Sequence, residues 1–430
     1  MKVGYLTFGR DDFGYGLAIC LDRLKGHEIY RVTPKTTKLV DYLLFSCFWW
    51  EHIYLLAEFL RRADIKKADS DRPKVVVGGF NAFNPIPFMA YSDFVVCGDG
   101  EEIISSVIAG GDPGLVWWNV KKLTGFCHET NDIARIELAR GCKFRCRFCA
   151  VSHLKPYRES SIEEIERCLK ETKLKRVSLF APEPTLYSQD KQLNLLCDRL
   201  SKVRIDSDVR LDRVGDRPYR VARVGIEGIS ERLRRSVGKP YKNEYIIKQI
   251  DKAIKAGRGG MFFYIILDLP GEEESDWEEF DGLLRKMGEI SGASGFVLKP
   301  SPSVFMPSPH TPMEYDEIHW ERDYKKKWYD FFRGGKNKRK WDIMMAERSR
   351  VFTSAMRILS MLSTRSGEEF FEIERELSQK KIIAIRSGRV ACLSLNRLLN
   401  VLEGYGGADR YCGKIDPEER KVPWKAVKFI

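Results

Sequence analysis

The sequence of 430 residues lacks the features of a membrane protein or of a secreted one. No apolar run is long enough to cross a bilayer. Arg10, Asp11 and Asp12 interrupt the N-terminus where a signal peptide would need an apolar core. The 11 cysteines are odd in number and do not form the spaced framework of a disulfide scaffold. We therefore expect a cytoplasmic protein with free thiols and no membrane span.

The sequence also lacks an internal repeat, a recognisable RNA-binding module and any second Cys-x-x-Cys unit that could complete a closed zinc site. What it has is the composition of a globular protein, with 43% hydrophobic and 31% charged residues, and enough length for two or three domains. The net charge of +12 fits either an anionic partner or a solvated basic surface.

Three cysteines do lie close together, at Cys142, Cys146 and Cys149, directly after an apolar strand predicted at residues 133–138. This spacing lets one loop turn three thiolates toward one point, and thiolates are soft ligands suited to zinc or to an iron–sulfur cluster. A structural zinc site needs four closed ligands. The pattern favours a cluster with one open iron, while zinc binding and three unrelated cysteines remain the alternatives.

The run 140–149, with Phe148 before the third cysteine, resembles the signature of the radical S-adenosylmethionine (radical SAM) enzymes. The resemblance implies that Cys142, Cys146 and Cys149 hold a [4Fe-4S] cluster. It also implies that the amino and carboxylate groups of S-adenosylmethionine chelate the fourth iron, and that Phe148 contacts adenine. An electron donor of the ferredoxin or flavodoxin type is the partner that such an enzyme requires.

The strand predicted at 176–180 ends in Ala181-Pro182-Glu183-Pro184. This element is similar in position to the Gly-Gly-Glu-Pro element that binds the methionine amino group in the family, although both glycines are replaced. A third strand is predicted at 208–212, where Arg210 could pair with the methionine carboxylate through a bidentate fork or form a surface ion pair.

Three later stretches resemble the same family. Residues 223–230 resemble its Gly-Ile-Glu-Ser-Gly stretch, which implies that Glu227 points inward and binds ribose hydroxyls or substrate. Asp268 and Leu269 begin a stretch similar to Gly-Leu-Pro-Gly-Glu, an adenine and substrate wall, with Asp268 in place of glycine. The proline-rich loop 305–312 carries His310, which could face the active site or merely order the loop.

The first 120 residues alternate short strands with helices, a pattern that predicts a parallel, doubly wound sheet. This segment resembles the Rossmann-like cobalamin-binding domain that precedes the barrel in one radical SAM branch. The family's Asp-x-His-x-x-Gly element is absent, and neither His27 nor His52 replaces it, so a relic domain without cofactor is the alternative. The expected cobalamin contacts lie at strand ends: Ser46, Cys47, Trp49, Gly78, Gly79, Gly98 and Gly100.

We therefore predict an α/β protein with three parts. Residues 1–120 form the cobalamin-binding-like Rossmann domain, residues 121–315 a partial (β/α)6 barrel of the TIM type, and residues 316–430 a mostly helical, basic region. In that last region, 320–350 mixes lysines and arginines with aromatic residues. Such a stretch either binds RNA through phosphates and stacking or packs its rings on the barrel. Helices are expected near 349–362 and 368–377, and two short strands within 380–395.

The predicted activity is reductive cleavage of S-adenosylmethionine to a 5′-deoxyadenosyl radical, followed by methylation of an unactivated carbon via methylcobalamin. The substrate is expected to be a macromolecule, with a protein side chain favoured over RNA. Three alternatives stay open: a cobalamin-free radical rearrangement or oxidation, methylthio transfer to RNA, and a non-enzymatic iron–sulfur sensor.

Overall fold

The computed structural model describes residues 1–8, 14–111, 114–130, 132–200, 202–206, 208–214, 220–292, 294–334, 353–386, 389–416, 418 and 424. The chain divides into two compact units, one formed by residues 1–122 with 355–430 and the other by residues 123–354. The domain boundaries expected at 120 and 315 stay predictions. Among the described residues, no helix combines the length and the apolar character that a membrane crossing requires.

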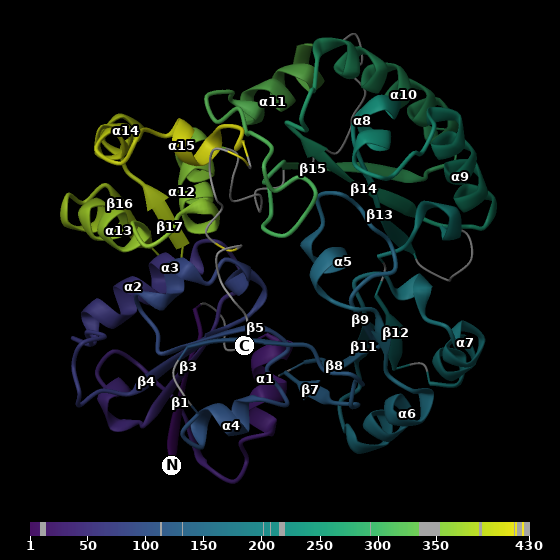
Figure 1. The fold of residues 1–430 in the computed structure, drawn as a ribbon. Helices are drawn as coiled ribbons and strands as arrows, with labels where there is room; N and C mark the ends of the chain where they lie inside the picture. The colour runs from purple at the N-terminus through teal and green to yellow at the C-terminus, as the bar shows by residue number, and fades with distance from the viewer. Residues whose placement is uncertain are drawn as a thin grey trace. The chain divides into compact units, whose positions relative to one another are not determined.

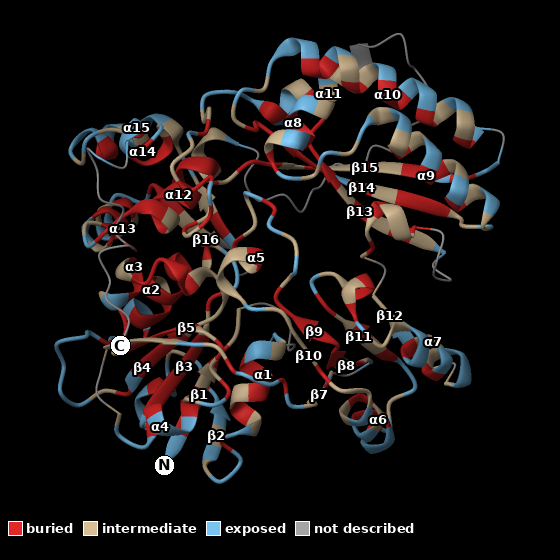
Figure 2. Ribbon diagram, turned by 45° about the vertical axis from the view of Figure 1, so that its right-hand side comes forward, coloured by how far each residue is buried: buried red, intermediate tan, exposed pale blue. Residues whose placement is uncertain are grey.

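The first unit is built on a parallel sheet whose strand order is β2-β1-β3-β4-β5-β6 (Figure 1). Its strands are β1 (Lys2–Leu6), β2 (Glu28–Arg31), β3 (Tyr42–Ser46), β4 (Lys74–Gly78), β5 (Phe94–Gly98) and β6 (Gly114–Trp118). The middle strands are apolar on both faces, and Figure 2 shows them as buried. A parallel sheet needs such runs because helices cover both of its faces. The predicted alternation of strands and helices is confirmed.

Helices from both chain segments cover this sheet. On one face, α1 (Tyr15–Asp22) and α4 (Ile104–Ile108) pack Leu17, Leu21 and Val107 against strand residues such as Leu44. The unit also contains α2 (His52–Arg62) and α3 (Ile86–Met89).

The C-terminal segment is anchored to the N-terminal one within the first unit. It contains α12 (Ser354–Arg365), α13 (Phe370–Gln379), the hairpin of β16 (Ile383–Arg386) and β17 (Arg389–Cys392), α14 (Leu395–Glu403) and α15 (Asp409–Cys412). Arg61 of α2 makes a bidentate ion pair with Glu374, whose side chain is 1% exposed. Tyr54 donates to the carbonyl of Leu359 at 2.8 Å. The helices and the hairpin expected here are confirmed, while the turn residues 387–388 lie outside the described part of the chain.

The second unit contains six parallel strands in two sheets. The first sheet has the order β12-β11-β8-β7, in which β7 (Cys127–Glu129) is antiparallel to β8 (Ala134–Glu137), and the second has the order β13-β14-β15. The remaining strands are β11 (Val177–Phe180), β12 (Val203–Ile205), β13 (Val221–Glu227), β14 (Gly260–Leu267) and β15 (Val297–Val304). A parallel bridge between Asp208 and Arg223 joins the two sheets.

The third strand predicted at 208–212 is wrong. The strand that pairs with β11 is β12, where Val203 lies opposite Val177. Residues 208–212 contribute only the bridge of Asp208, and the chain then turns into a short 3-10 helix, Leu211–Arg213. The apolar Val209 and Leu211 are buried in this connection, which explains why the segment resembled a strand.

Helices follow the strands of the second unit in the order expected for a partial barrel. They are α5 (Ala150–Leu154), α6 (Ile162–Glu171), α7 (Asp190–Arg199), α8 (Glu231–Ser236), α9 (Asn243–Lys255), α10 (Glu274–Gly292) and α11 (Tyr324–Gly334). The predicted start of α6 is confirmed as a capping box between Ser161 and Glu164.

Candidate active site

A short antiparallel ladder closes the cysteine loop at its base. Strands β9 (Ala139–Arg140) and β10 (Arg158–Glu159) pair on either side of residues 141–157. Gly141 has φ +79°, and a Cβ atom there would lie 2.4 Å from the carbonyl oxygen of Pro156, so only glycine allows the two arms to approach. Arg140 forms a buried, bidentate ion pair with Glu137 at the end of β8. The loop is therefore held rigidly at the carboxyl end of the first barrel strand.

The three thiols of this loop influence one another. Cys142 lies within electrostatic range of Cys149, Glu183 and Lys239, and Cys146 within range of Lys239, Cys149 and Cys142. Burial raises the pKa of the Cys146 thiol to about 11 and that of the Cys142 thiol above its ordinary value.

The donor chemistry of the loop fits a cluster ligated by three thiolates. None of the 11 cysteines is in a disulfide, so all three thiols are available as ligands. Across the described residues, no group of three or more His, Cys, Asp or Glu side chains is arranged to hold a metal ion. The three thiols thus share one neighbourhood, and the Cys-x3-Cys-x2-Cys spacing stays the basis of the cluster prediction.

The turn after α8 supports the cysteine loop from one side. The amide of Arg147 donates to the carbonyl of Val237 at 3.1 Å. Gly238 has φ +83°, and a Cβ built on it lies 3.7 Å from the Cα of Cys146. This contact brings the next residue, Lys239, to the cysteines.

Lys239 and Glu227 form a buried ion pair beside Cys146, and sequence reasoning did not single out the lysine. The Nζ of Lys239 lies 2.8 Å from Oε1 of Glu227 and donates to the carbonyl of Gly225 at 3.0 Å. A side chain at Gly225 would collide with both groups, since its Cβ would lie 2.3 Å from the glutamate oxygen and 2.7 Å from Nζ. Burial lowers the pKa of Lys239, but Glu227 outweighs it and the net pKa is raised, so the lysine is a permanent cation. The only sequence signal was the family-like pattern that runs through Gly238-Lys239-Pro240.

Glu183 lies in the same electrostatic neighbourhood. Its carboxylate accepts from the amide of Thr185 at 3.2 Å and from the Thr185 hydroxyl. Burial raises the pKa of Glu183, and Lys239 and Arg210 act in the opposite direction. Glu183 therefore caps the 3-10 turn that begins at Pro184.

The other residues expected to contact S-adenosylmethionine differ in exposure. Ala181 and Leu269 are buried, Phe148 is half-buried and Pro182 is exposed. Arg210 makes a bidentate ion pair with Asp212, with atoms 2.7 and 3.1 Å apart. Its guanidinium also lies 4.1 Å from the ring centre of Phe144 in the cysteine loop. Of the two roles expected for Arg210, the structure shows the ion pair.

Asp268 is occupied by groups of the protein itself. Its carboxylate is 1% exposed and accepts from the amide of His319 at 3.0 Å, from Nδ1 of His319 at 2.7 Å and from the hydroxyl of Tyr324 at 2.9 Å. These bonds hold the segment before α11 on the end of β14, so the structure gives Asp268 a structural role in place of the predicted substrate contact. His310 donates its amide to Glu314 at 2.6 Å, and this bond orders the proline-rich loop.

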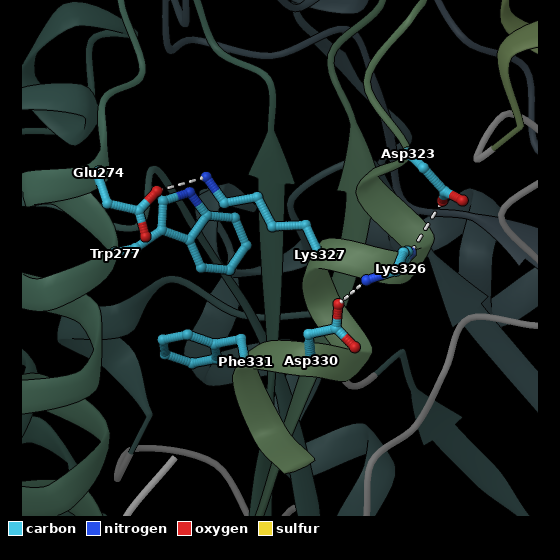
Figure 3. Close-up of a pocket in the computed structure, with 7 residues that line it drawn as sticks. All are labelled: Glu274, Trp277, Asp323, Lys326, Lys327, Asp330 and Phe331. Atoms are coloured by element: carbon cyan, nitrogen blue, oxygen red, sulfur yellow. Dashed lines mark hydrogen bonds and ion pairs between the residues drawn. The ribbon is translucent and has the colours of Figure 1, made fainter. Parts of the chain in front are cut away.

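The expected aromatic–basic stretch packs mainly on the barrel within the described residues. Figure 3 shows a hollow of about 430 Å³ between α10 and α11. Lys327 pairs there with Glu274 and lies 4.7 Å from the ring centre of Trp277, while Lys326 pairs with Asp330. Trp328 is fully buried against Phe280. Of the two interpretations, packing on the barrel is confirmed for 324–332; Lys336 to Trp341 lie outside the described residues.

The carboxyl edge of the N-terminal sheet carries exposed rings. Phe48 and Trp49, just after β3, are 54% and 47% exposed, and their ring centres lie 4.9 Å apart. Phe48 also lies 6.2 Å from Phe80, which follows β4. Ser46 and Gly78 end these two strands as register partners. The edge therefore presents a row of aromatic faces.

Three glycines expected to approach a macrocycle instead approach the protein. A Cβ on Gly79 would lie 2.5 Å from the carbonyl oxygen of Cys47, and one on Gly98 would lie 2.0 Å from that of Trp118. One on Gly100 would lie 3.0 Å from the sulfur of Cys20. Cys47 is fully buried, and burial raises the pKa of its thiol well above the ordinary value. Close packing of the chain itself thus explains these positions.

The family model described as the radical SAM superfamily matches residues 136–284, and the model described as the N-terminal region of radical SAM proteins matches residues 31–111. The predicted radical SAM character is confirmed by these matches. Uncharacterized protein MJ0966 of Methanocaldococcus jannaschii is 28% identical over 193 residues, which is 43% of this chain and 43% of that protein. The chain thus spans less than half the length of this curated relative.

Solved structures are similar in fold. The radical S-adenosylmethionine methyltransferase TsrM from Kitasatospora setae, determined with cobalamin and a [4Fe-4S] cluster bound, superposes with a TM-score of 0.54 and 16% identity. That superposition covers 73% of this chain and 77% of TsrM. The cobalamin-dependent S-adenosylmethionine radical enzyme OxsB gives a TM-score of 0.46 at 12% identity, over 94% of this chain and 71% of OxsB.

Proposed function

Because the chain carries a radical SAM domain over residues 136–284, we propose that it cleaves S-adenosylmethionine reductively, at the cysteine loop, to methionine and a 5′-deoxyadenosyl radical. The observation that supports this most is the gathering of three thiols, two carboxylates and one buried cation at the carboxyl ends of barrel strands. Cys142, Cys146 and Cys149 supply the thiols, and Glu183, Glu227 and Lys239 supply the charges. Reactive groups of barrel enzymes lie at this end.

Each group has a separate task in this proposal. The three cysteines hold a [4Fe-4S] cluster, which when bound supplies the single electron for cleavage. Lys239 is a buried cation beside Cys146 and attracts the carboxylate of the methionine moiety. Glu227 keeps Lys239 in place and accepts hydrogen bonds from ribose hydroxyls. Glu183 fixes the strand end whose carbonyls accept from the methionine ammonium.

We extend the proposal to cobalamin, bound at the carboxyl edge of the N-terminal sheet. The support is the exposed pair Phe48 and Trp49, because a flat macrocycle is a natural cover for aromatic faces at a strand edge. Cobalamin, when bound, supplies the methyl group for an unactivated carbon. We propose a protein side chain as the methyl acceptor.

A second candidate is a radical SAM enzyme without cobalamin, performing a rearrangement or an oxidation. It is favoured by Gly79, Gly98 and Gly100, whose missing side chains are accounted for by the protein's own packing. Methylthio transfer, which needs a second cluster, gains no support from Cys47 and Cys97. Both are buried, the Cys97 thiol donates to the carbonyl of Ala82, and burial raises its pKa to about 12.

Cobalamin content separates the two candidates. The chain is expressed with cobalamin in the medium, and its visible spectrum and cobalt content are measured for the native protein and for Phe48→Ala/Trp49→Ala. We expect about one cobalt per native chain and several-fold less in the variant. The matched control is Leu39→Ala, an apolar residue that is 68% exposed in the same unit. A cobalt-free native protein that still forms 5′-deoxyadenosine would establish the second candidate.

A further inference from the structure

The cysteine loop exposes cations that alternate with its cysteines. Arg145 and Arg147 flank Cys146, and both side chains are exposed. Arg147 donates to the carbonyl of Ser236 at 3.1 Å, which leaves its charge uncompensated. Within the described part of the chain, neither arginine forms an ion pair. Cations in such a position face whatever approaches the loop from solvent.

A second pair of cations lies on the turn that packs against this loop. Gly238 is exposed, and a Cβ built on it lies 3.5 Å from the carbonyl oxygen of Arg145. Arg235 precedes this turn and Lys242 follows it, and both are exposed and without an ion pair to any described residue. We call Arg145, Arg147, Arg235 and Lys242 the basic face.

Carboxylates near the basic face are engaged elsewhere. Glu227 pairs with Lys239, and Asp212 pairs with Arg210. Glu244 is an exposed acid near Lys242 in the sequence, and it offsets one of the four charges. A patch of one sign concentrates the field of the protein and speeds the encounter with an oppositely charged partner.

We propose that the basic face is the docking surface for a small acidic one-electron carrier protein. This inference rests on the proposed function, because it assumes a cluster on the loop. In the step, the reduced centre of the carrier loses one electron and the cluster gains it, with no bond or proton transferred. A carrier must approach the cluster and then leave quickly, and electron-transfer encounters accordingly use small, charge-steered interfaces.

A nucleic acid is the other polyanion that a basic patch could attract. Single-stranded RNA is held by exposed aromatic rings as well as by cations. Among the described residues, the exposed large apolar side chains include none from the cysteine loop or from residues 235–242. The basic face therefore offers charge without a stacking platform, which favours the acidic protein.

The test measures the rate at which reduced flavodoxin, an acidic carrier, reduces the reconstituted cluster of the full chain. Anaerobic stopped flow follows the loss of visible cluster absorbance at low salt and at about 0.2 M salt. The variant Arg235→Glu/Lys242→Glu leaves the cysteine loop unchanged. Its matched control is Lys170→Glu/Lys191→Glu, which reverses two exposed lysines on α6 and α7.

We expect the second-order rate of Arg235→Glu/Lys242→Glu to fall by about 10- to 100-fold at low salt. The native and control rates should equal each other and fall steeply with salt. Equal rates for the native protein and Arg235→Glu/Lys242→Glu would overturn the proposal. So would a loss of binding to single-stranded RNA in this variant while its reduction by flavodoxin is unchanged.

Dithionite keeps this test separate from the proposed function. With this small reductant, native, variant and control proteins should form 5′-deoxyadenosine equally. An absence of 5′-deoxyadenosine in all three would contradict the proposed function and would not bear on the rate difference with flavodoxin. Iron content, measured in each preparation, confirms that the reversals have not removed the cluster.

Discussion

Replacing Lys239 by methionine tests the assignment of the buried cation. The change keeps the length of the side chain and removes its charge, so Glu227 is left buried with neither its ion pair nor the hydrogen-bonded ammonium. Truncating one partner of a buried, hydrogen-bonded charge pair costs about 2–5 kcal/mol. If the same cation binds the carboxylate of S-adenosylmethionine, the loss appears in the affinity for that ligand. Since 1.4 kcal/mol is a factor of ten, we expect binding about 30-fold to several thousand-fold weaker.

The assay is equilibrium binding of S-adenosylmethionine to the cluster-loaded protein, alongside iron content and thermal stability. Lys248→Met, an exposed lysine on α9, is the matched control and should bind normally. Lys239→Met/Glu227→Gln removes the orphaned charge and should recover stability without recovering affinity. Normal affinity in Lys239→Met with a full cluster would refute the carboxylate assignment, and recovered affinity in the double variant would show that the lysine acts only through Glu227.

Two further predictions concern the N-terminal unit. Asp93 and Arg72 form a buried ion pair; although burial alone would raise it, hydrogen bonds from Arg72 and from the amide of Val75 hold the pKa of Asp93 below its usual value. The pair therefore stabilises the fold above the unfolded pKa of about 3.9 and the stability is lost as pH falls through the lower folded pKa, so Arg72→Met should cost about 3–5 kcal/mol at pH 7 and less in acid. Urea unfolding followed by tryptophan fluorescence across pH measures this, and an equal loss at all pH values would contradict it. Gly98→Ala places a Cβ 2.0 Å from the Trp118 carbonyl oxygen at φ +100°, so it should lower the yield of folded protein and the unfolding midpoint, whereas Gly16→Ala, where the added atom meets open space, should not; a native-like Gly98→Ala would disprove the packing explanation.

Local spacing carried much of the prediction. Cysteines four and then three residues apart, after an apolar strand, indicated a ligand loop, and the structure closes that loop with the β9–β10 ladder. Alternating strands and helices likewise predicted both parallel sheets. These features depend on residues close in sequence, which is where pattern carries information.

Contacts between distant residues were not predictable in this way. Asp268 looked like a substrate residue because it replaces a glycine, yet its partner groups come from His319 and Tyr324, 51 and 56 residues later. Lys239 is an ordinary lysine in the sequence, and only the approach of Gly238 to the cysteine loop reveals its position. The glycines after β4 and β5 were correctly expected to permit a close approach, but sequence could not tell a ligand from the protein's own backbone.

The central claim is that Cys142, Cys146 and Cys149 form a centre that cleaves S-adenosylmethionine. The most direct measurement is the formation of 5′-deoxyadenosine by the anaerobically reconstituted protein with S-adenosylmethionine and dithionite, quantified together with iron content. We predict the product for the native protein, and neither product nor bound cluster for Cys142→Ala/Cys146→Ala/Cys149→Ala. A native protein with a full cluster and no 5′-deoxyadenosine, or a triple variant that keeps a full cluster, would contradict the account.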